Sequence, residues 1–165
     1  MGVEIERKFL VTDDSWRAHC TAPDRAIRQG YLVNGLPNTV RVRVADFDAW
    51  LTIKGPAIGL SRAEFEYAIP LADAEEMLAT RCVGPLIEKM RRRIAWNNLV
   101  IELDEFFGAN VGLIIAEVEL PEEHTPFTPP DWFGGEVSHD FRYHNSQLSK
   151  WPFSTWAKST TLARP

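Results

Sequence analysis

The sequence has few of the residues that mark metal-cluster and disulfide-rich proteins. Only two cysteines and four histidines occur among its 165 residues. Cys20 and Cys82 lie far apart and have none of the spacings typical of zinc ligands, and the histidines also fall in no ligand motif. Two such cysteines in a chain of this length indicate reduced thiols rather than a disulfide scaffold.

Long apolar runs and an excess of positive charge are also missing. No run approaches the ~18 residues that are needed to cross a bilayer. Charged residues occur within the first eight positions and no apolar stretch follows as in a secretory signal peptide, so we expect a cytoplasmic protein with no membrane partner. The formal net charge of −5 argues against binding of nucleic acid through bulk positive charge. Any anion that the protein binds must therefore meet a local cluster of bases.

Length and composition favour one globular domain. Hydrophobic residues make up 45% of the chain, enough to form a substantial core. We expect residues 1–165 to form a single domain, in which residues 1–120 carry the strands and residues 121–165 form a C-terminal helical tail. The tail is rich in aromatic residues that should not remain in water, so we expect it to dock on the strands or to plug one end of them.

Short segments in which charged and apolar residues alternate recur through the first 120 residues. Because successive side chains of a strand point to opposite faces, residues 3–10 place Glu4, Glu6 and Lys8 on one face. Later segments repeat this pattern, with mostly valine, isoleucine, leucine and phenylalanine on the apolar face. Their charged faces carry Arg41 and Arg43, Lys54, Glu64 and Glu66, Lys89, Arg91 and Arg93, Glu102 and Asp104, and Glu117 and Glu119.

The segments between these strands contain helix and turn signals. Capping and helix-forming residues predict helices over residues 14–20, 72–81 and 128–133. Glycine and proline predict a loop over residues 55–62, of the kind that lies at the mouth of a site, and a turn over residues 82–85. The asparagine pair at 97–98 predicts a tight hairpin, and the prolines after residue 120 argue against a further strand.

The distribution of charge decides between two ways of arranging these strands. One face of seven strands carries eight acids and seven bases, whereas the opposite face is almost entirely apolar. The strands therefore form either a sandwich whose charged faces meet water or a closed barrel whose charges point inward. Like charges are grouped by strand, which a solvated face does not require. We therefore expect a mainly β (α+β) fold, an antiparallel closed barrel with a few helices packed outside.

Grouped charges of this kind suit a site for metal ions and polyanions. Adjacent carboxylates are typical ligands of Mg²⁺ or Mn²⁺, and arginine and lysine bind phosphate oxygens. Phosphoryl transfer needs mainly this charge neutralisation, because negative charge spreads over the transferred and leaving groups. An acid on the other strands could orient the attacking water or accept its proton. The candidates for that role are Glu64, Glu66, Glu102 and Asp104.

These motifs resemble those of the CYTH family, the triphosphate tunnel metalloenzymes. Glu4-x-Glu6-x-Lys8 is similar to the family's N-terminal signature, and the later pairs follow in the family's order as far as Leu120. The resemblance implies an eight-stranded antiparallel barrel that forms a hydrophilic tunnel, in which a triphosphate is bound and cleaved with Mg²⁺ or Mn²⁺. It also allows a homodimer.

The resemblance further implies roles for single residues. Glu4, Glu6 and Glu119, with Glu117 beside them, match the metal carboxylates. Tyr31 matches a tyrosine that works near the leaving group, here with Lys54. The residues that match the phosphate-binding bases are Lys8, Arg41, Arg43, Lys54, Lys89 and Arg91. Arg93 lies outside the matched motifs and receives no role.

The compact chain, with no feature that marks a base-binding pocket, favours a small substrate that consists mostly of phosphate. We therefore expect a hydrolase that cleaves the terminal phosphate of inorganic tripolyphosphate. The alternatives within the family are a thiamine triphosphatase and a class IV adenylate cyclase. An alternative from another class is a non-catalytic sensor that binds polyphosphate or nucleotide, although such a receptor would need few of the acids.

Overall fold

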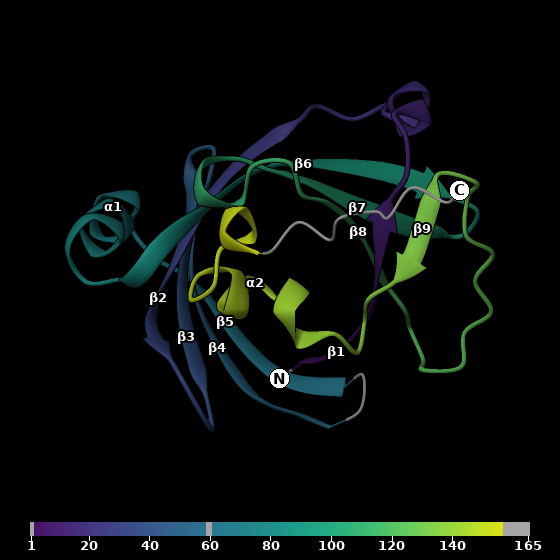
Figure 1. Ribbon diagram of the computed structural model, residues 1–165. Coiled ribbons are helices and arrows are strands. Elements are labelled where there is room, and N and C mark those ends of the chain that lie inside the picture. Colours follow the sequence, from purple (N-terminus) through teal and green to yellow (C-terminus); the bar gives the residue numbers. More distant parts are fainter. Residues whose placement is uncertain (1, 59–60, 157–165) are drawn as a thin grey trace.

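The computed structural model describes residues 2–58 and 61–156, and only the backbone of residues 2–4, 57 and 61. Within these residues the main feature is one antiparallel sheet of nine strands (Figure 1). The mainly β class expected from the alternation is confirmed. The strands are β1 (Gly2–Val11), β2 (Arg25–Asn34), β3 (Thr39–Ala45), β4 (Asp48–Ile58), β5 (Ser61–Ala68), β6 (Val83–Trp96), β7 (Leu99–Phe106), β8 (Ile114–Glu119) and β9 (Phe133–Glu136).

The helices are few and most of them are short. Helix α1 (Leu71–Thr80) agrees with the helix expected over residues 72–81, and the residues expected as a helix over 14–20 form a 3₁₀ turn at Ser15–His19. Further 3₁₀ turns lie at Gly108–Asn110, Phe141–Tyr143 and Phe153–Thr155, and α2 covers Asn145–Leu148. None of the helices in the described part of the chain is long and apolar enough to cross a membrane.

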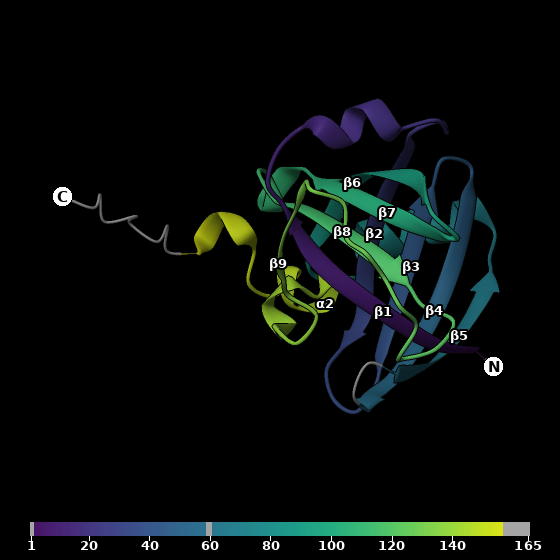
Figure 2. The ribbon, with the colours of Figure 1, turned by 90° about the vertical axis from the view of Figure 1, so that its right-hand side faces the viewer.

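Strand β1 is the element on which the sheet is organised. The strand order is β5-β4-β3-β2-β6-β7-β8-β1-β9, and β1 also pairs with β5. Its first residues pair with β5, with Gly2 opposite Glu64, whereas Glu6 and Lys8 lie opposite Glu119 and Glu117 of β8. The strands accordingly curve around a common axis (Figure 2).

The sequence predicted a loop over residues 55–62 and a turn over residues 82–85. Both predictions are wrong for the residues that the structure describes. Strand β4 continues to Ile58 and β5 begins at Ser61, because Ala57 pairs with Arg62 across the two strands and Arg62 Nε donates to the Gly55 carbonyl oxygen at 2.6 Å. Residues 59–60 lie outside the described part of the chain. The turn expected over residues 82–85 is replaced by the start of β6, where Val83 pairs with Tyr31.

The segment after β8 also differs from its prediction. No helix occurs over residues 128–133, and the chain there runs beside β1 and leads into β9, a strand that the prolines had argued against. The Thr12 amide donates to the Trp132 carbonyl oxygen at 3.0 Å, and the Trp132 side chain is buried in the core. Tertiary packing of one aromatic residue therefore outweighs the local helix signals.

The apolar faces of the strands are covered from outside at two places. Trp16 and Trp132 pack on β7 and β8, and helix α1 packs Ala74 and Leu78 against β3. The tail packs differently: Leu148 of α2 is fully buried against Ile87 and Ile115, which share a strand face with Lys89 and Glu117, so it lies on the inner side at one end of the strands. Because the outer apolar faces are turned toward the two tryptophans and α1, the charged faces point toward the middle of the molecule.

Candidate active site

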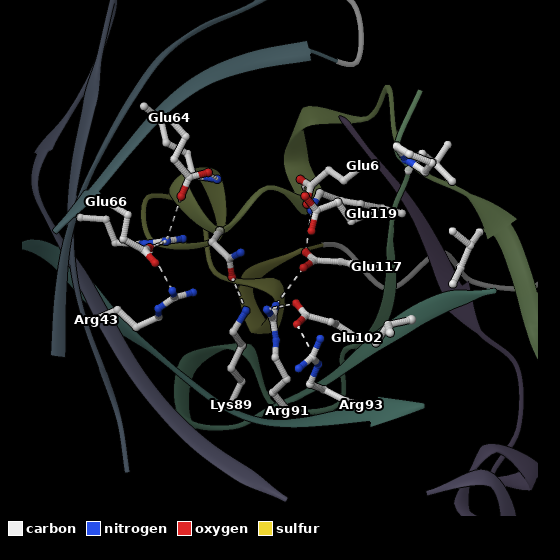
Figure 3. Close-up of a pocket in the computed structure, with 18 of the residues that line it drawn as sticks. Glu6, Arg43, Glu64, Glu66, Lys89, Arg91, Arg93, Glu102, Glu117 and Glu119 are labelled. Carbon is white, nitrogen blue, oxygen red and sulfur yellow. Dashed lines mark hydrogen bonds and ion pairs between the residues drawn. The ribbon is translucent and has the colours of Figure 1, made fainter. Parts of the chain in front are cut away.

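The charged faces of seven strands surround one cavity of about 880 Å³ (Figure 3). The charges are thus gathered around an enclosed space rather than spread over an open, solvated face. The ionisable residues that line the cavity are Glu6, Lys8, Arg41, Arg43, Lys54, Glu64, Glu66, Lys89, Arg91, Arg93, Glu102, Glu117 and Glu119.

Two residues expected at the site do not line this cavity, and a third has a side chain that the structure does not describe. Asp104 is fully buried behind Lys89 and Arg91 and does not line the cavity. Tyr31 lines a smaller adjacent cavity that also contains Lys54, so the two residues that the family resemblance pairs do lie together. Glu4 is part of β1, but its side chain is outside the described part of the structure.

Carboxylates from β1 and β8 form one wall, centred on Lys8. Its Nζ lies 2.5 Å from Glu117 Oε1 and 2.7 Å from Glu6 Oε1. Burial by itself lowers the pKa of Lys8, but the charges of Glu117 and Glu6 outweigh burial, and the pKa is raised. Burial likewise raises the pKa of Glu117, but Lys8 and Arg91 reverse this and hold it well below its usual range. Both groups are therefore charged near neutral pH.

Arg91 of β6 occupies the centre of the cavity floor. Its Nε and Nη2 each lie 2.7 Å from an oxygen of Asp104, a bidentate pair that fixes the guanidinium plane. Nη2 also lies 2.9 Å from Glu117 Oε2, and Nη1 contacts Glu102. Lys89 Nζ lies 2.5 Å from the same Asp104. One buried carboxylate therefore holds two bases toward the cavity.

The bases of β3 and β4 form the opposite wall. Arg43 Nη2 donates to Glu66 Oε2 at 3.0 Å, and the Thr52 hydroxyl donates to the same oxygen at 2.9 Å. Arg41 Nη2 lies 3.1 Å from the Thr52 hydroxyl oxygen, and Lys54 Nζ lies 3.0 Å from Glu64 Oε2. Bases on two facing walls can bind the successive phosphoryl groups of one polyanion.

The arginines that follow Arg91 behave as the period of two predicts. Arg92 points to the outside, where its guanidinium pairs with Asp24 and Glu105. Arg93 lines the mouth of the cavity with 64% of its side chain exposed, and its Nε lies 3.6 Å from Glu102 Oε1.

The acids of the cavity fit a hard cation that is held together with phosphate. Among the described residues, no three histidine, cysteine or acidic side chains form a group that could hold a metal ion. Glu6 and Glu119 face each other across β1 and β8 and both line the cavity (Figure 3). Mg²⁺ is commonly bound by one or two carboxylates plus substrate phosphates, so this pair of oxygen donors suits it.

Sequence reasoning missed five residues of the smaller cavity, which are Thr39, Arg62, His144, Asn145 and Ser146. Arg62 follows the same period of two as Glu64 and Glu66, but the loop expected over residues 55–62 concealed this signal. His144 and Asn145 lie in the tail, where no strand pattern marks them.

Comparisons with known proteins place the chain among relatives of one family. Residues 2–150 match the CYTH domain. The chain is 45% identical to an inorganic triphosphatase of Acetivibrio thermocellus over 156 residues, which cover 94% of this chain and 99% of that protein. It is 37% identical to an inorganic triphosphatase of Nitrosomonas europaea over 155 residues, with 88% and 96% covered. A crystal structure of an inorganic triphosphatase aligns with a TM-score of 0.65 and 32% identity, covering 90% of this chain and 95% of that one.

Proposed function

This chain belongs to the CYTH domain family, and on that premise we propose that it is an inorganic triphosphatase, which hydrolyses tripolyphosphate to pyrophosphate and phosphate. The observation that carries the proposal is the single cavity in which bases from β1, β3, β4 and β6 face acids from β1, β5, β7 and β8. The two curated relatives, both inorganic triphosphatases, support the choice of substrate.

The bases bind and orient the substrate. Lysines and arginines lie on several walls, so a linear anion can be held along its whole length and its charge neutralised as the bond breaks. The residues with this role are Lys8, Arg41, Arg43, Lys54, Lys89 and Arg91. Asp104 acts behind them as a positioning residue, because it holds both Lys89 and Arg91 and has no contact with the cavity.

The acids have two roles. Glu6 and Glu119, with Glu4 and Glu117 from the same strands, hold Mg²⁺ or Mn²⁺. Such an ion, when bound, neutralises charge on the phosphate oxygens and lowers the pKa of water. Glu64, Glu66 or Glu102 orients the attacking water or accepts its proton.

Tyr31 and Lys54 act at the leaving group. Burial raises the pKa of Tyr31 to about 12, although Arg41 opposes the effect, so its hydroxyl remains a hydrogen-bond donor during turnover. Because Lys54 lines both cavities, it can place its charge beside a group that Tyr31 contacts.

We also propose that β1 to β8 act as a closed barrel and that the whole chain is one domain, with residues 121–165 as its tail. The pairing of β1 with β5 supports closure. Contacts of the tail with the strands, such as the buried Leu148, support a single folding unit. The partner is then a small triphosphate and no nucleic acid, and a homodimer is compatible with this arrangement.

A panel of substrates tests the proposal. Phosphate release is measured with tripolyphosphate, thiamine triphosphate, ATP and long-chain polyphosphate, each with Mg²⁺ and with Mn²⁺. We expect kcat/KM for tripolyphosphate to exceed that for ATP by at least about tenfold, since the walls offer ionic contacts to phosphate. Glu6→Gln should lose turnover, whereas Glu75→Gln on the outside of α1 should not.

Several outcomes contradict this assignment. Equal or greater phosphate release from ATP excludes it, and formation of cyclic AMP identifies a cyclase. A preference for thiamine triphosphate identifies a thiamine triphosphatase. A protein that binds tripolyphosphate in the same cavity without releasing phosphate under either metal is a sensor.

A further inference from the structure

A smaller cavity of about 40 Å³ adjoins the large one. Lys8, Arg41 and Lys54 line both cavities, which places the small one at an end of the space that receives the substrate. Other residues line only the small cavity. These are Tyr31, Thr39, Arg62, His144 and Ser146.

Arg62 differs from the other bases in its partners. Its Nε donates to the Gly55 carbonyl oxygen at 2.6 Å and its Nη2 to the Thr39 hydroxyl oxygen at 3.5 Å, both neutral acceptors. Every base that lines the large cavity lies within ion-pair distance of a carboxylate. Among the described side chains, no carboxylate pairs with Arg62; Glu4 lies opposite it in β1, with a side chain outside the described part of the structure. A half-buried guanidinium whose described partners are all neutral retains the capacity to bind an anion.

The balance of charge in the small cavity also favours binding of an anion. Its lining contains four strong bases, Lys8, Arg41, Lys54 and Arg62, against Glu6 as the one carboxylate among the lining residues that the structure describes. Neutral donors surround them, including the Tyr31 hydroxyl. A phosphoryl group accepts hydrogen bonds on three oxygens, so this mixture of charged and neutral donors suits it.

Residues 144–146 of the tail form one wall of the small cavity, and this wall is fixed in place. Asn34 of β2 donates its Nδ2 to the Ser146 carbonyl oxygen at 2.7 Å. Asn145, which lines both cavities, has its Oδ1 3.5 Å from Lys89 Nζ. Contacts with β2 and β6 therefore hold residues 144–146 in place, and these residues form the end of the binding space.

Building on the proposed function, we propose that the small cavity is a subsite for one terminal phosphoryl group of the substrate, with Arg62 as its main ligand. A terminal phosphoryl group carries more negative charge than an internal one, and its three free oxygens can meet the arginine fork and neighbouring neutral donors together. Because residues 144–146 close the space beyond it, the subsite accepts the end of a chain and not its middle.

Equilibrium binding without divalent metal tests this subsite, because nothing needs to be hydrolysed. Tripolyphosphate and pyrophosphate are titrated calorimetrically into the full chain at low salt. We expect Arg62→Gln to weaken tripolyphosphate binding by about tenfold or more, the contribution of a hydrogen-bonded charge. Pyrophosphate also ends in such groups, so its binding should weaken in the same direction.

Two further variants make the result specific. Arg28→Gln removes an arginine that pairs with Glu75 on the outer surface, and it should bind both ligands as the parent does. Ser146→Asp places a carboxylate in the small cavity and should weaken tripolyphosphate binding by about tenfold through competition for Arg62. Thermal unfolding of each variant checks that the fold is kept.

The outcomes separate this inference from the proposed function. Parent-like tripolyphosphate binding by Arg62→Gln, or no binding by the parent, overturns the subsite. If the parent hydrolyses tripolyphosphate and Arg62→Gln binds it normally, the hydrolase stands without the subsite. If binding depends on Arg62 but no phosphate is released with either metal, the subsite stands and the hydrolase assignment fails.

Discussion

Among single residues, Asp104 illustrates how this site depends on groups that cannot touch the substrate. A buried carboxylate is stable only when it is paired, and Asp104 is paired with both Arg91 and Lys89. The same contacts limit the movement of these two bases, which line the cavity. The carboxylate thus contributes orientation to the site although it lies behind the cavity wall.

Lys89 sets an upper pH limit for substrate binding. Burial lowers its pKa to about 8, although Asp104 opposes the effect. As the pH rises through that value the ammonium loses its proton, so kcat/KM for tripolyphosphate should fall above about pH 8. Lys89→Arg remains charged there, and its falling limb should move to higher pH. Profiles of kcat/KM against pH for the two proteins provide the measurement, and identical falling limbs would show that Lys89 does not set the limit.

For single residues, the sequence predicts the strand face of a side chain better than how deeply that side chain is buried. The period of two correctly places Glu102 and Asp104 on one face of β7, yet only Glu102 reaches the cavity. Depth depends on how neighbouring strands curve, which a linear pattern does not contain. Arg62 was hidden for a different reason, because glycine and proline around residue 55 suggested a loop where cross-strand pairing continues.

At the scale of elements, helix α2 shows how a four-residue helix is held on the sheet. Leu148 is fully buried between side chains of β6, β7 and β8, whereas Phe141, earlier in the same tail, is 64% exposed. A helix this short has almost no stability of its own, so this packing decides its position. Since α2 carries Asn145 and Ser146, the position of these cavity residues depends on an apolar contact outside the cavity.

Leu148→Ala should therefore be strongly destabilising. Removal of a fully buried leucine side chain costs about 2–5 kcal/mol in the free energy of unfolding, because it leaves a cavity. Phe141→Ala should change this free energy by no more than about 0.5 kcal/mol. Chemical denaturation of both variants gives the comparison, and similar values for the two would mean that the tail adds no stability through Leu148.

Elements with a strong internal pattern were predicted well. The strand over residues 99–106, the hairpin at 97–98 and helix α1 agree with the sequence because alternation, turn residues and helix formers all act locally. Strand β9 could not be predicted in this way. It exists because residues distant in the chain act on it: β1 provides its hydrogen-bond partners, and the Trp132 side chain just before it is buried in the cluster on β7 and β8.

Across the whole molecule, the cavity neutralises its own charges before any ligand arrives. Lys8 pairs with Glu6 and Glu117, and the arginines of β3 and β6 pair with acids of β5, β7 and β8. When a polyanion binds, its phosphate oxygens replace the carboxylates as partners of the bases. The released carboxylates are then available to bind a cation. Metal and phosphate are thus expected to enter the site as complementary partners.

Removal of metal should consequently abolish turnover without unfolding the protein. With a chelator, phosphate release from tripolyphosphate is expected to stop, while the unfolding midpoint stays within about 2 °C of its value with Mg²⁺, because Lys8 compensates the acids. Proteins with structural metal sites behave differently, since chelators unfold them. Calorimetry with and without chelator distinguishes the two cases, and a large fall in the midpoint would assign the metal a structural role.

Strand β1 has a further consequence for how the protein is made. Of the described strands it is synthesised first, but its hydrogen-bond partners lie in β5, β8 and β9, the last of them at Phe133–Glu136. The hairpins of β2 to β5 can assemble during synthesis, whereas β1 keeps unpaired edges until most of the chain has been translated. Pairing over such long sequence separations is slow. During this interval the unpaired edge of β1 is open to pairing with other chains.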